Sequence, residues 1–342
     1  MEFIKYEIKK GDTLESIALK YKLDVRELIS FHNQHCGITN TIIDNYLPIH
    51  LQYLFLNHNS IHEKNLLKIN NKVVDTNIKY RINMYQKLIA NDKVFADTDT
   101  EIIWNLKFLE IAESKIIIEI KTISYEVKNQ PADTSKLINF SMLFNYPVEN
   151  LKLELNHYGK IERILNQKEV FEKWQTLRNK DLAQYQYEES MKGIFIAGDN
   201  EFSDTIKSLQ NNLLYVLFFD KVYNTPFLSE PYIGDSINLH SKLFQGTKIP
   251  FTNTQEFYNN ENIKVKNRYS FIVNTETREL EKKYLANYKS LIGEDFNYDY
   301  YIESDAGYHI ENGILQYLDA VCIEKSNEKL FHHTQYKVQL LN

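Results

Sequence analysis

The sequence predicts an α+β protein: a small βααβ module followed by a larger curved antiparallel β-sheet domain with packed helices. Two observations predict this class. The first fifty residues alternate between strand-like and helix-like patterns, and most of the remaining chain consists of strand-like runs joined by short turns. We therefore expect the module at 1–52, a linker at 53–66 and the sheet domain at 67–342.

The first strand of the module is predicted from Ile4, Tyr6 and Ile8, which alternate with charged residues. Gly11 ends this strand. Two acidic pairs then have the spacing of capping boxes, Asp12 with Glu15 and Asp24 with Glu27. Behind each cap, apolar residues recur at helical spacing, and a returning strand is predicted over Leu47, Ile49 and Leu51.

These motifs resemble the LysM domain, a small βααβ carbohydrate-binding module, from about Ile4 to Leu51. The resemblance rests on Tyr6, the Gly11-Asp12-Thr13-Leu14 turn, the Ile17-Ala18 pair, Lys20-Tyr21, and Asn33 at the position of the family's helix-ending asparagine. The sequence departs from the family where Asp44 replaces the usual glycine and His50 the usual proline.

In LysM domains the sugar lies in a shallow groove between two loops. By resemblance, this implies a glycan-binding or partner-binding site formed by Gly11, Asp12, Thr13, Leu14, Thr39, Asn40, Thr41, Ile42 and Ile43. The Gly-Asp-Thr-Leu turn is also explained by turn and capping needs without any ligand.

The composition indicates a globular chain and argues against nucleic acid as a main partner. The formal net charge is −6 with a sequence pI of about 6.0, and no long run of one sign occurs. Phosphate binding needs a concentrated basic face, which this pattern does not supply. The two cysteines, Cys36 and Cys322, are far apart in sequence, so no disulfide framework is predicted.

The N-terminus predicts a cytoplasmic protein. Residues 1–5 lead directly into the first strand, without the features of a signal peptide or a lipidation cysteine, and no apolar run approaches the ~20 residues of a membrane span. Cell-wall glycan lies outside that compartment. LysM-like modules without signal peptides resemble those of phage-tail-like contractile machines, where the module binds another protein.

We therefore predict a non-enzymatic adaptor or chaperone that serves a contractile injection or type VI secretion apparatus or its effector. Its partner would be a component of that machine or the effector. Two alternatives stay open. One is a peptidoglycan-binding protein that reaches the wall by lysis or through such a machine, and the other is a carrier of an apolar ligand in the sheet domain.

The pattern after the linker is mainly β. Two helices interrupt it, one behind Asn166 and one from about Glu201. The stretch 278–292 fits both a helix and a long strand. The predicted strands are 79–89, 101–111, 115–127, 136–145, 151–157, 160–165, 264–273, 297–303, 307–310, 314–323 and 330–340.

Two short phrases, Ile233-Gly234-Asp235-Ser236 and the run from Tyr308 to Ile314, resemble bacterial lipoprotein-carrier and lipocalin-like domains. The resemblance implies a concave sheet that holds an apolar ligand or a partner segment, and it assigns no binding residue. A carrier role predicts a dry pocket inside the sheet.

The sequence contains little that indicates catalytic or metal-binding chemistry. His32, His35, Cys36, His58 and His62 could converge on a zinc ion, but His32 completes an apolar stripe and the others lie among polar residues. No nucleophile elbow, phosphate-binding glycine loop, dinucleotide fingerprint or zinc-protease motif occurs. The sequence therefore predicts no enzyme activity, no metal and no cofactor.

Overall fold

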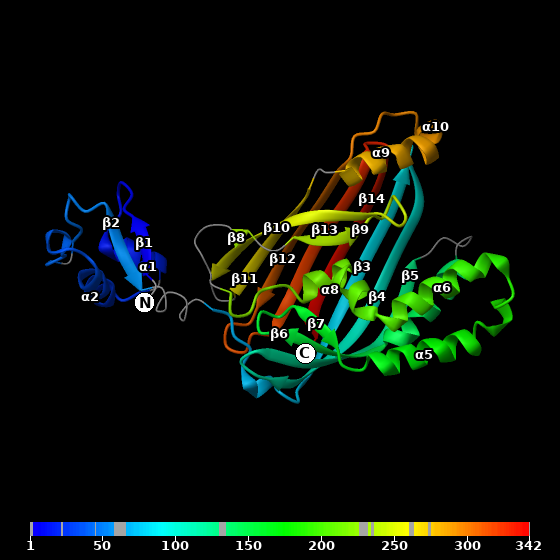
Figure 1. Cartoon of the computed structure of the whole chain (residues 1–342), viewed down its shortest axis with the longest axis horizontal. Helices are drawn as coiled ribbons and strands as arrows, with labels where there is room; N and C mark the ends of the chain where they lie inside the picture. Colours follow the sequence, from blue (N-terminus) through cyan, green and yellow to red (C-terminus); the bar gives the residue numbers. More distant parts are fainter. Residues whose placement is uncertain are drawn as a thin grey trace. The chain divides into compact units, whose positions relative to one another are not determined.

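The computed structural model describes residues 3–21, 23–44, 46–57, 66–129, 135–225, 232–233, 236–259, 263–272 and 275–341. By its contacts, the chain divides into two compact units. The N-terminal unit comprises Met1–Leu67 with Asn224–Glu230, and the sheet unit comprises Lys68–Tyr223 with Pro231–Asn342 (Figure 1).

The N-terminal unit has the predicted βααβ order. Its elements are β1 (Phe3–Glu7), α1 (Leu14–Tyr21), α2 (Val25–His35), the 3-10 turn η1 (Ile38–Asn40) and β2 (Tyr53–Asn57). β1 and β2 pair antiparallel, from Phe3 opposite Asn57 to Glu7 opposite Tyr53.

The returning strand does not lie where the sequence predicted it. Leu47 to Leu51 forms an irregular turn, in which Leu51 N donates to Pro48 O at 2.9 Å and Ile49 is fully exposed. The buried alternation falls instead on Leu54 and Leu56 in β2, inside the stretch 53–66 that we expected to be a linker. The strand prediction for Leu47, Ile49 and Leu51 is therefore wrong.

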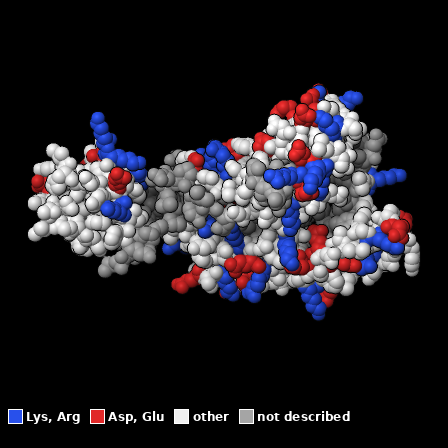
Figure 2. Space-filling view, turned by 45° about the horizontal axis from the view of Figure 1, so that its top comes forward, with Lys and Arg blue, Asp and Glu red and all other residues white. Residues whose placement is uncertain are grey.

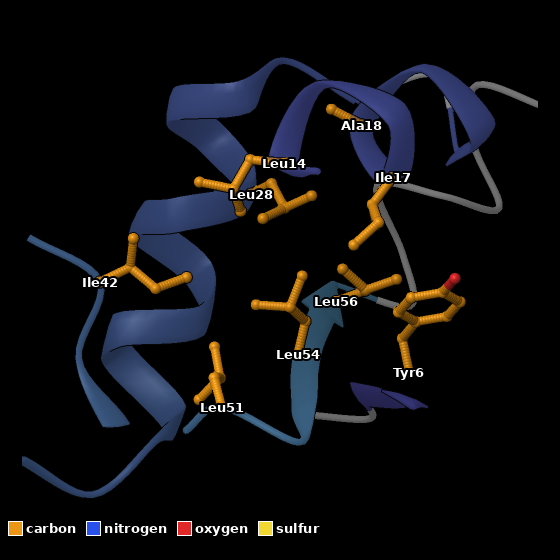
Figure 3. Close-up of a cluster of buried hydrophobic side chains, with 9 residues drawn as sticks. All are labelled: Tyr6, Leu14, Ile17, Ala18, Leu28, Ile42, Leu51, Leu54 and Leu56. Carbon is orange, nitrogen blue, oxygen red and sulfur yellow. The ribbon is translucent and has the colours of Figure 1, made fainter. Parts of the chain in front are cut away.

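One apolar core holds the N-terminal unit together. Figure 3 shows that its side chains come from both strands, both helices and the stretch between α2 and β2. Burial of these side chains supplies the main driving force for folding of this unit. The core residues are Tyr6, Leu14, Ile17, Ala18, Leu28, Ile42, Leu51, Leu54 and Leu56.

The sheet unit contains one large antiparallel sheet, to which twelve strands contribute within the described residues. The order is β7-β6-β5-β4-β3-β14-β13-β12-β11-β10-β8, with β9 also on β10, so the last strand of the chain pairs with β3 at the centre. The strands are β3 (Asn77–Ala90), β4 (Lys93–Ile111), β5 (Lys115–Asn129), β6 (Asn150–Asn156), β7 (Ile161–Ile164), β8 (Tyr232–Ile233), β9 (Ile237–His240), β10 (Lys248–Asn259), β11 (Ile263–Phe271), β12 (Asp299–Tyr308), β13 (Leu315–Asn327) and β14 (Leu330–Leu341).

Helices connect the two edges of this sheet. The chain leaves β7 at one edge and returns in β8 at the other, through α5 (Gln167–Asn179), α6 (Glu189–Ser203), α7 (Thr205–Gln210) and α8 (Leu213–Phe218). α8 packs on the central strands, where the Phe218 ring lies 5.0 Å from that of Tyr80 and 5.4 Å from that of Trp104. In Figure 1 the outer strands bend toward the face that carries α8, and this confirms the curved sheet with packed helices.

Three local predictions for the sheet unit need correction. Residues 136–145, predicted as a strand, form α4 (Ser135–Met142) and part of the 3-10 segment η4 (Leu143–Val148). Phe140 and Phe144 are four residues apart and contact each other at 5.5 Å between ring centroids, a helical contact that fits two aromatic residues. Phe144 also packs on the Trp174 ring at 5.8 Å.

The helix expected from Glu201 is broken. It corresponds to the end of α6 followed by α7 and α8, and Asn212 caps the new helix by accepting from Leu214 N at 3.0 Å. Among the missed elements are the first part of α6, β9 and all of β10. The ambiguous stretch 278–292 is helical, as α9 (Thr275–Asn287) and α10 (Lys289–Ile292), while 297–303 and 307–310 merge into the single strand β12.

Surface charges are mixed in sign. On the face shown in Figure 2, basic and acidic side chains of the sheet unit lie interspersed. Several of them pair directly: Lys128 lies 2.8 Å from Glu101, and Lys266 lies 3.0 Å from Glu303. In the part of the chain that the structure describes, no helix has the length and apolar character needed to cross a membrane.

Candidate functional site

The first predicted loop is a turn that Asp12 organises. Its Oδ2 accepts from Lys9 N at 2.8 Å and from the Tyr6 hydroxyl at 2.7 Å. These two donors hold the pKa of the Asp12 carboxyl below its usual range, with the Lys9 N–H the larger cause. Gly11 adopts φ +95°, a conformation that glycine reaches without strain.

Thr13, not Asp12, caps α1. Ser16 N donates to Thr13 Oγ1 at 3.1 Å, and Thr13 N donates to Ser16 Oγ at 2.8 Å. This reciprocal pair is a capping box, one residue later than predicted, because Asp12 is engaged by Tyr6 and Lys9. The predicted cap of α2 is confirmed for Asp24, whose Oδ1 accepts from Arg26 N at 2.8 Å and Glu27 N at 3.2 Å.

The second predicted loop is fixed by side chains of α2. Asn33 exchanges two hydrogen bonds of 2.8 Å with the backbone of Ile42, and His32 Nε2 lies 3.0 Å from Asn40 O. His50 Nε2 also lies 3.0 Å from Thr39 O. The loop from Thr39 to Ile43 is therefore held from two sides before any ligand arrives.

The nine predicted site residues divide by exposure. Leu14 and Ile42 are 0% and 2% exposed and belong to the core of the unit (Figure 3), so they anchor the two loops and do not offer side chains to a ligand. Gly11, Thr13, Thr39 and Ile43 are exposed, and Asp12, Asn40 and Thr41 are half-buried. Both loops thus attach to one core.

The sequence reasoning missed three exposed apolar residues near the second loop. Ile38 and Ile49 have almost fully exposed side chains, and Tyr46 is 69% exposed. The bond between His50 and Thr39 keeps the turn that carries Ile49 beside the loop. For Ile38 and Tyr46 the signal was available, since both lie between Gly37 and Pro48 in a stretch without helix or strand periodicity. Ile49 was instead assigned to the predicted returning strand.

His32 is a structural residue and not a metal ligand. Its Nδ1 accepts from Phe55 N at 3.0 Å, so its Nε2 carries the proton that Asn40 O accepts. Both ring nitrogens are occupied, and burial lowers the pKa of His32. Within the described ranges no group of three metal-ligating side chains occurs, and His58 and His62 lie outside them.

Several cavities lie in the described part of the sheet unit, and two of them border the helices α7 and α8. One of about 620 Å³ lies between α6 to α8 and the strands that carry Ile102, Trp104 and Tyr336. Its lining is partly polar, because it includes Glu201, Ser208 and His240. A second cavity of about 280 Å³ lies among α7, α8, β7 and the strands β9 to β11.

The comparison with protein families addresses the N-terminal unit. A family model described as the LysM domain matches residues 6–31, which run from Tyr6 through the turn and α1 into α2. The LysM resemblance of this segment is confirmed. The matched range contains Gly11, Asp12, Thr13 and Leu14 but ends before the second loop. A comparison with curated proteins gives no match.

Two solved structures show limited likeness to the chain. A structure titled lipid–protein interactions in lipovitellin has a TM-score of 0.41 at 8% identity, covering 79% of this chain and 25% of that one. An outer-membrane channel from Pseudomonas putida F1 has a TM-score of 0.16 at 5% identity, covering 78% of this chain and 96% of the channel. The chain thus spans a quarter of the lipovitellin chain, and neither TM-score establishes a shared function.

Proposed function

We propose that the chain is a non-enzymatic binding protein whose N-terminal unit binds a glycan of the peptidoglycan type, rich in N-acetylglucosamine. The observation that carries this proposal is the similarity of residues 6–31 to the LysM domain. LysM modules bind such glycans, and here the matched range includes the whole first loop of the expected groove.

The geometry of the two loops supports a preformed site. The first loop is ordered by Asp12 and Thr13, and the second by Asn33 and His32, all through hydrogen bonds within the unit. A ligand that binds ordered loops does not have to provide the free energy of ordering them, and this favours affinity. The exposed side chains of Thr13, Thr39 and Ile43 are available to contact it.

The test is co-sedimentation of the full chain with purified sacculi, together with calorimetric titration of soluble N-acetylglucosamine oligomers. Ile43→Glu introduces a charge at a side chain that is 90% exposed, so the fold should tolerate it. We expect this variant to bind about tenfold more weakly or worse, as for loss of a central contact.

Leu137→Glu provides the matched control, because Leu137 is 68% exposed in α4 of the sheet unit. This variant should sediment like the unmodified chain. A chain that binds neither sacculi nor oligomers, or an Ile43→Glu variant that binds as well as Leu137→Glu, would contradict the proposal.

Other roles expected from the sequence stay predictions. The adaptor or chaperone role in a contractile injection apparatus and the cytoplasmic location are not addressed by the fold or by the comparisons. The carrier role anticipated a dry pocket, whereas the larger cavity has a mixed polar and apolar lining.

A further inference from the structure

The cavity among α7, α8, β7 and the strands β9 to β11 is lined by a buried carboxyl group. The cavity measures about 280 Å³, close to the lower end of the ~300–1,000 Å³ typical of small-molecule sites. Asp220, which follows α8 and is 7% exposed, lines it together with Asn253 and Gln255 from β10 and Tyr269 from β11.

The hydrogen-bond donors around Asp220 are already committed to it. Gln255 Nε2 donates to Asp220 Oδ2 at 2.9 Å, and the Tyr269 hydroxyl donates to the same oxygen at 3.3 Å. Lys221 N donates to Asp220 Oδ1 at 2.7 Å. These contacts fix the carboxyl group in place. The side-chain donors of Gln255 and Tyr269 therefore already have an acceptor in Asp220.

The hydrogen-bond acceptors beside Asp220 are not all satisfied. Gln255 Oε1 and Asn253 Oδ1 have no partner among the described residues, although their side chains are only 1% and 4% exposed. The amide nitrogen of Asn253 donates to Asn267 Oδ1 at 3.3 Å, and that of Gln255 donates to Asp220. In both side chains the nitrogen therefore has a hydrogen-bond partner and the carbonyl oxygen has none among the described residues. Buried polar atoms normally have a partner, and one that lines a cavity can obtain it from a ligand.

The remaining wall of the cavity is mixed: Gln210, Asn211, Tyr215, Ser236 and Asn238 are polar or carry a hydroxyl group, and apolar residues form another part. Leu209 and Phe219 are buried, and Ile161, Val216 and Ile237 complete this side. Lys160 and Lys221 also line the cavity and contribute positive charge. Both lysines have interactions of their own within the unit, so the groups in need of partners at the buried end are acceptors.

We propose that this cavity binds a small primary amine with an apolar body, whose ammonium group bonds to the Asp220 carboxylate, Gln255 Oε1 and Asn253 Oδ1. An ammonium group carries three donors and no acceptor, which matches a site with a carboxylate and two unpaired carbonyl oxygens. Its charge also compensates that of a buried carboxylate, whereas an anionic ligand would face the like charge of Asp220. The apolar wall accommodates the carbon chain.

Three probes of equal chain length test the ligand class on the full chain: hexylamine, hexanol and hexanoate. Calorimetry and ligand-observed NMR should show hexylamine binding about tenfold more tightly than the other two, because only its head group forms charge-assisted bonds. Equal or tighter binding of hexanol or hexanoate overturns the proposal, and so does the absence of any binding.

Two variants locate the site. Val216→Phe fills the cavity from α8, and Asp220→Asn removes the negative charge; each should weaken hexylamine binding about tenfold or more. Val94→Phe, the same substitution at a residue 50% exposed in β4, should leave binding unchanged. If Asp220→Asn fails to fold, Val216→Phe decides alone, and undiminished hexylamine binding by a folded Val216→Phe overturns the assignment. All residues that line this cavity belong to the sheet unit, so Ile43→Glu should bind hexylamine normally.

Discussion

Asn33 and Ile42 exchange two hydrogen bonds, from Asn33 Nδ2 to Ile42 O and from Ile42 N to Asn33 Oδ1, both 2.8 Å long. The side-chain amide of α2 thus pairs with the loop backbone much as a neighbouring strand would. Ile42 is 2% exposed in the core and the adjacent Ile43 is 90% exposed. The two bonds therefore fix which of two consecutive isoleucines faces the core and which faces solvent.

We predict that Asn33→Ala destabilises the N-terminal unit by about 1–3 kcal/mol, because it leaves two partly buried backbone groups of Ile42 without partners. Chemical denaturation followed by NMR signals of this unit measures the change. Gln34→Ala, an exposed position on the same helix, should have little effect. Equal stability of the two variants would show that the pairing does not stabilise the loop.

His32 gives the N-terminal unit a specific acid sensitivity. Its Nδ1 accepts from Phe55 N, so protonation would remove that bond and charge a side chain that is 0% exposed. Burial holds its folded pKa below the ~6.5 of an unfolded histidine. The unfolded chain therefore binds the proton first, so the His32 contribution is complete above about pH 6.5 and decreases as the pH falls toward the folded pKa.

We expect the free energy of unfolding of the N-terminal unit to fall as the pH decreases from about 6.5 toward the folded pKa of His32, with a slope of up to about 1.4 kcal/mol per pH unit. Denaturation at several pH values gives this slope. His32→Asn should be less stable at pH 7 and should lose most of the slope. A slope retained in full by His32→Asn would assign the acid sensitivity to other groups.

The front of the N-terminal unit was readable from the sequence because its signals are local. Asp24 caps α2 as its spacing predicts, and the apolar stripes of both helices form the core. The cap of α1 was misassigned because Asp12 has a partner, Tyr6, that only the folded turn brings near. The returning strand was misplaced because Leu47, Ile49 and Leu51 alternate just as Leu54 and Leu56 do, and a period of two does not reveal which run pairs with β1.

In the sheet unit, too, local patterns were predicted correctly and features that depend on distant parts of the chain were not. Long alternating runs such as β3, β5, β13 and β14 were predicted near their observed bounds. Most of α6, before Glu201, was missed because Gly193 and Gly198 indicate a loop in a single sequence. The cavity around Asp220 could not be predicted, because Asp220, Gln255 and Tyr269 meet only when the chain after α8 reaches strands β10 and β11.

Gly198 is required by a close contact between α6 and α5. A Cβ added there would lie 2.4 Å from Trp174 Cζ2. The ring cannot easily move, because Trp174 is 0% exposed and its Nε1 donates to Asp199 Oδ1 at 2.8 Å. We predict that Gly198→Ala destabilises the sheet unit by about 1–3 kcal/mol through overpacking.

Gly193 in the same helix supplies the control for this prediction. No atom lies within 4 Å of its added Cβ, so Gly193→Ala should stabilise the sheet unit by about 0.5–1 kcal/mol through the higher helix propensity of alanine. Thermal unfolding of the two variants provides the comparison. A Gly198→Ala variant as stable as Gly193→Ala would mean that the Trp174 ring shifts without a loss of stability.

The bond between Tyr6 and Asp12 should link the core of the N-terminal unit to the first loop of the candidate site. Tyr6→Phe keeps the ring and removes the hydroxyl that donates to Asp12 Oδ2, so we expect a loss of about 1 kcal/mol in the stability of this unit. The pKa of the Asp12 carboxyl should rise in the variant. It should stay below its usual range, since Lys9 N, the larger cause of the shift, still donates.

NMR titration of the Asp12 carboxyl carbon measures this shift. Because the folded pKa lies below the unfolded value of ~3.9, the Asp12 contribution to stability is present above about pH 4 and is lost as the pH falls through the folded pKa. Tyr6→Phe should reduce that loss. Tyr46→Phe removes an analogous hydroxyl, which donates to Asp44 Oδ2 at 2.9 Å from an exposed ring, and should leave the Asp12 pKa and the stability nearly unchanged. If the Asp12 pKa does not move in Tyr6→Phe, Lys9 N alone holds the carboxylate, and the loop is independent of the core tyrosine.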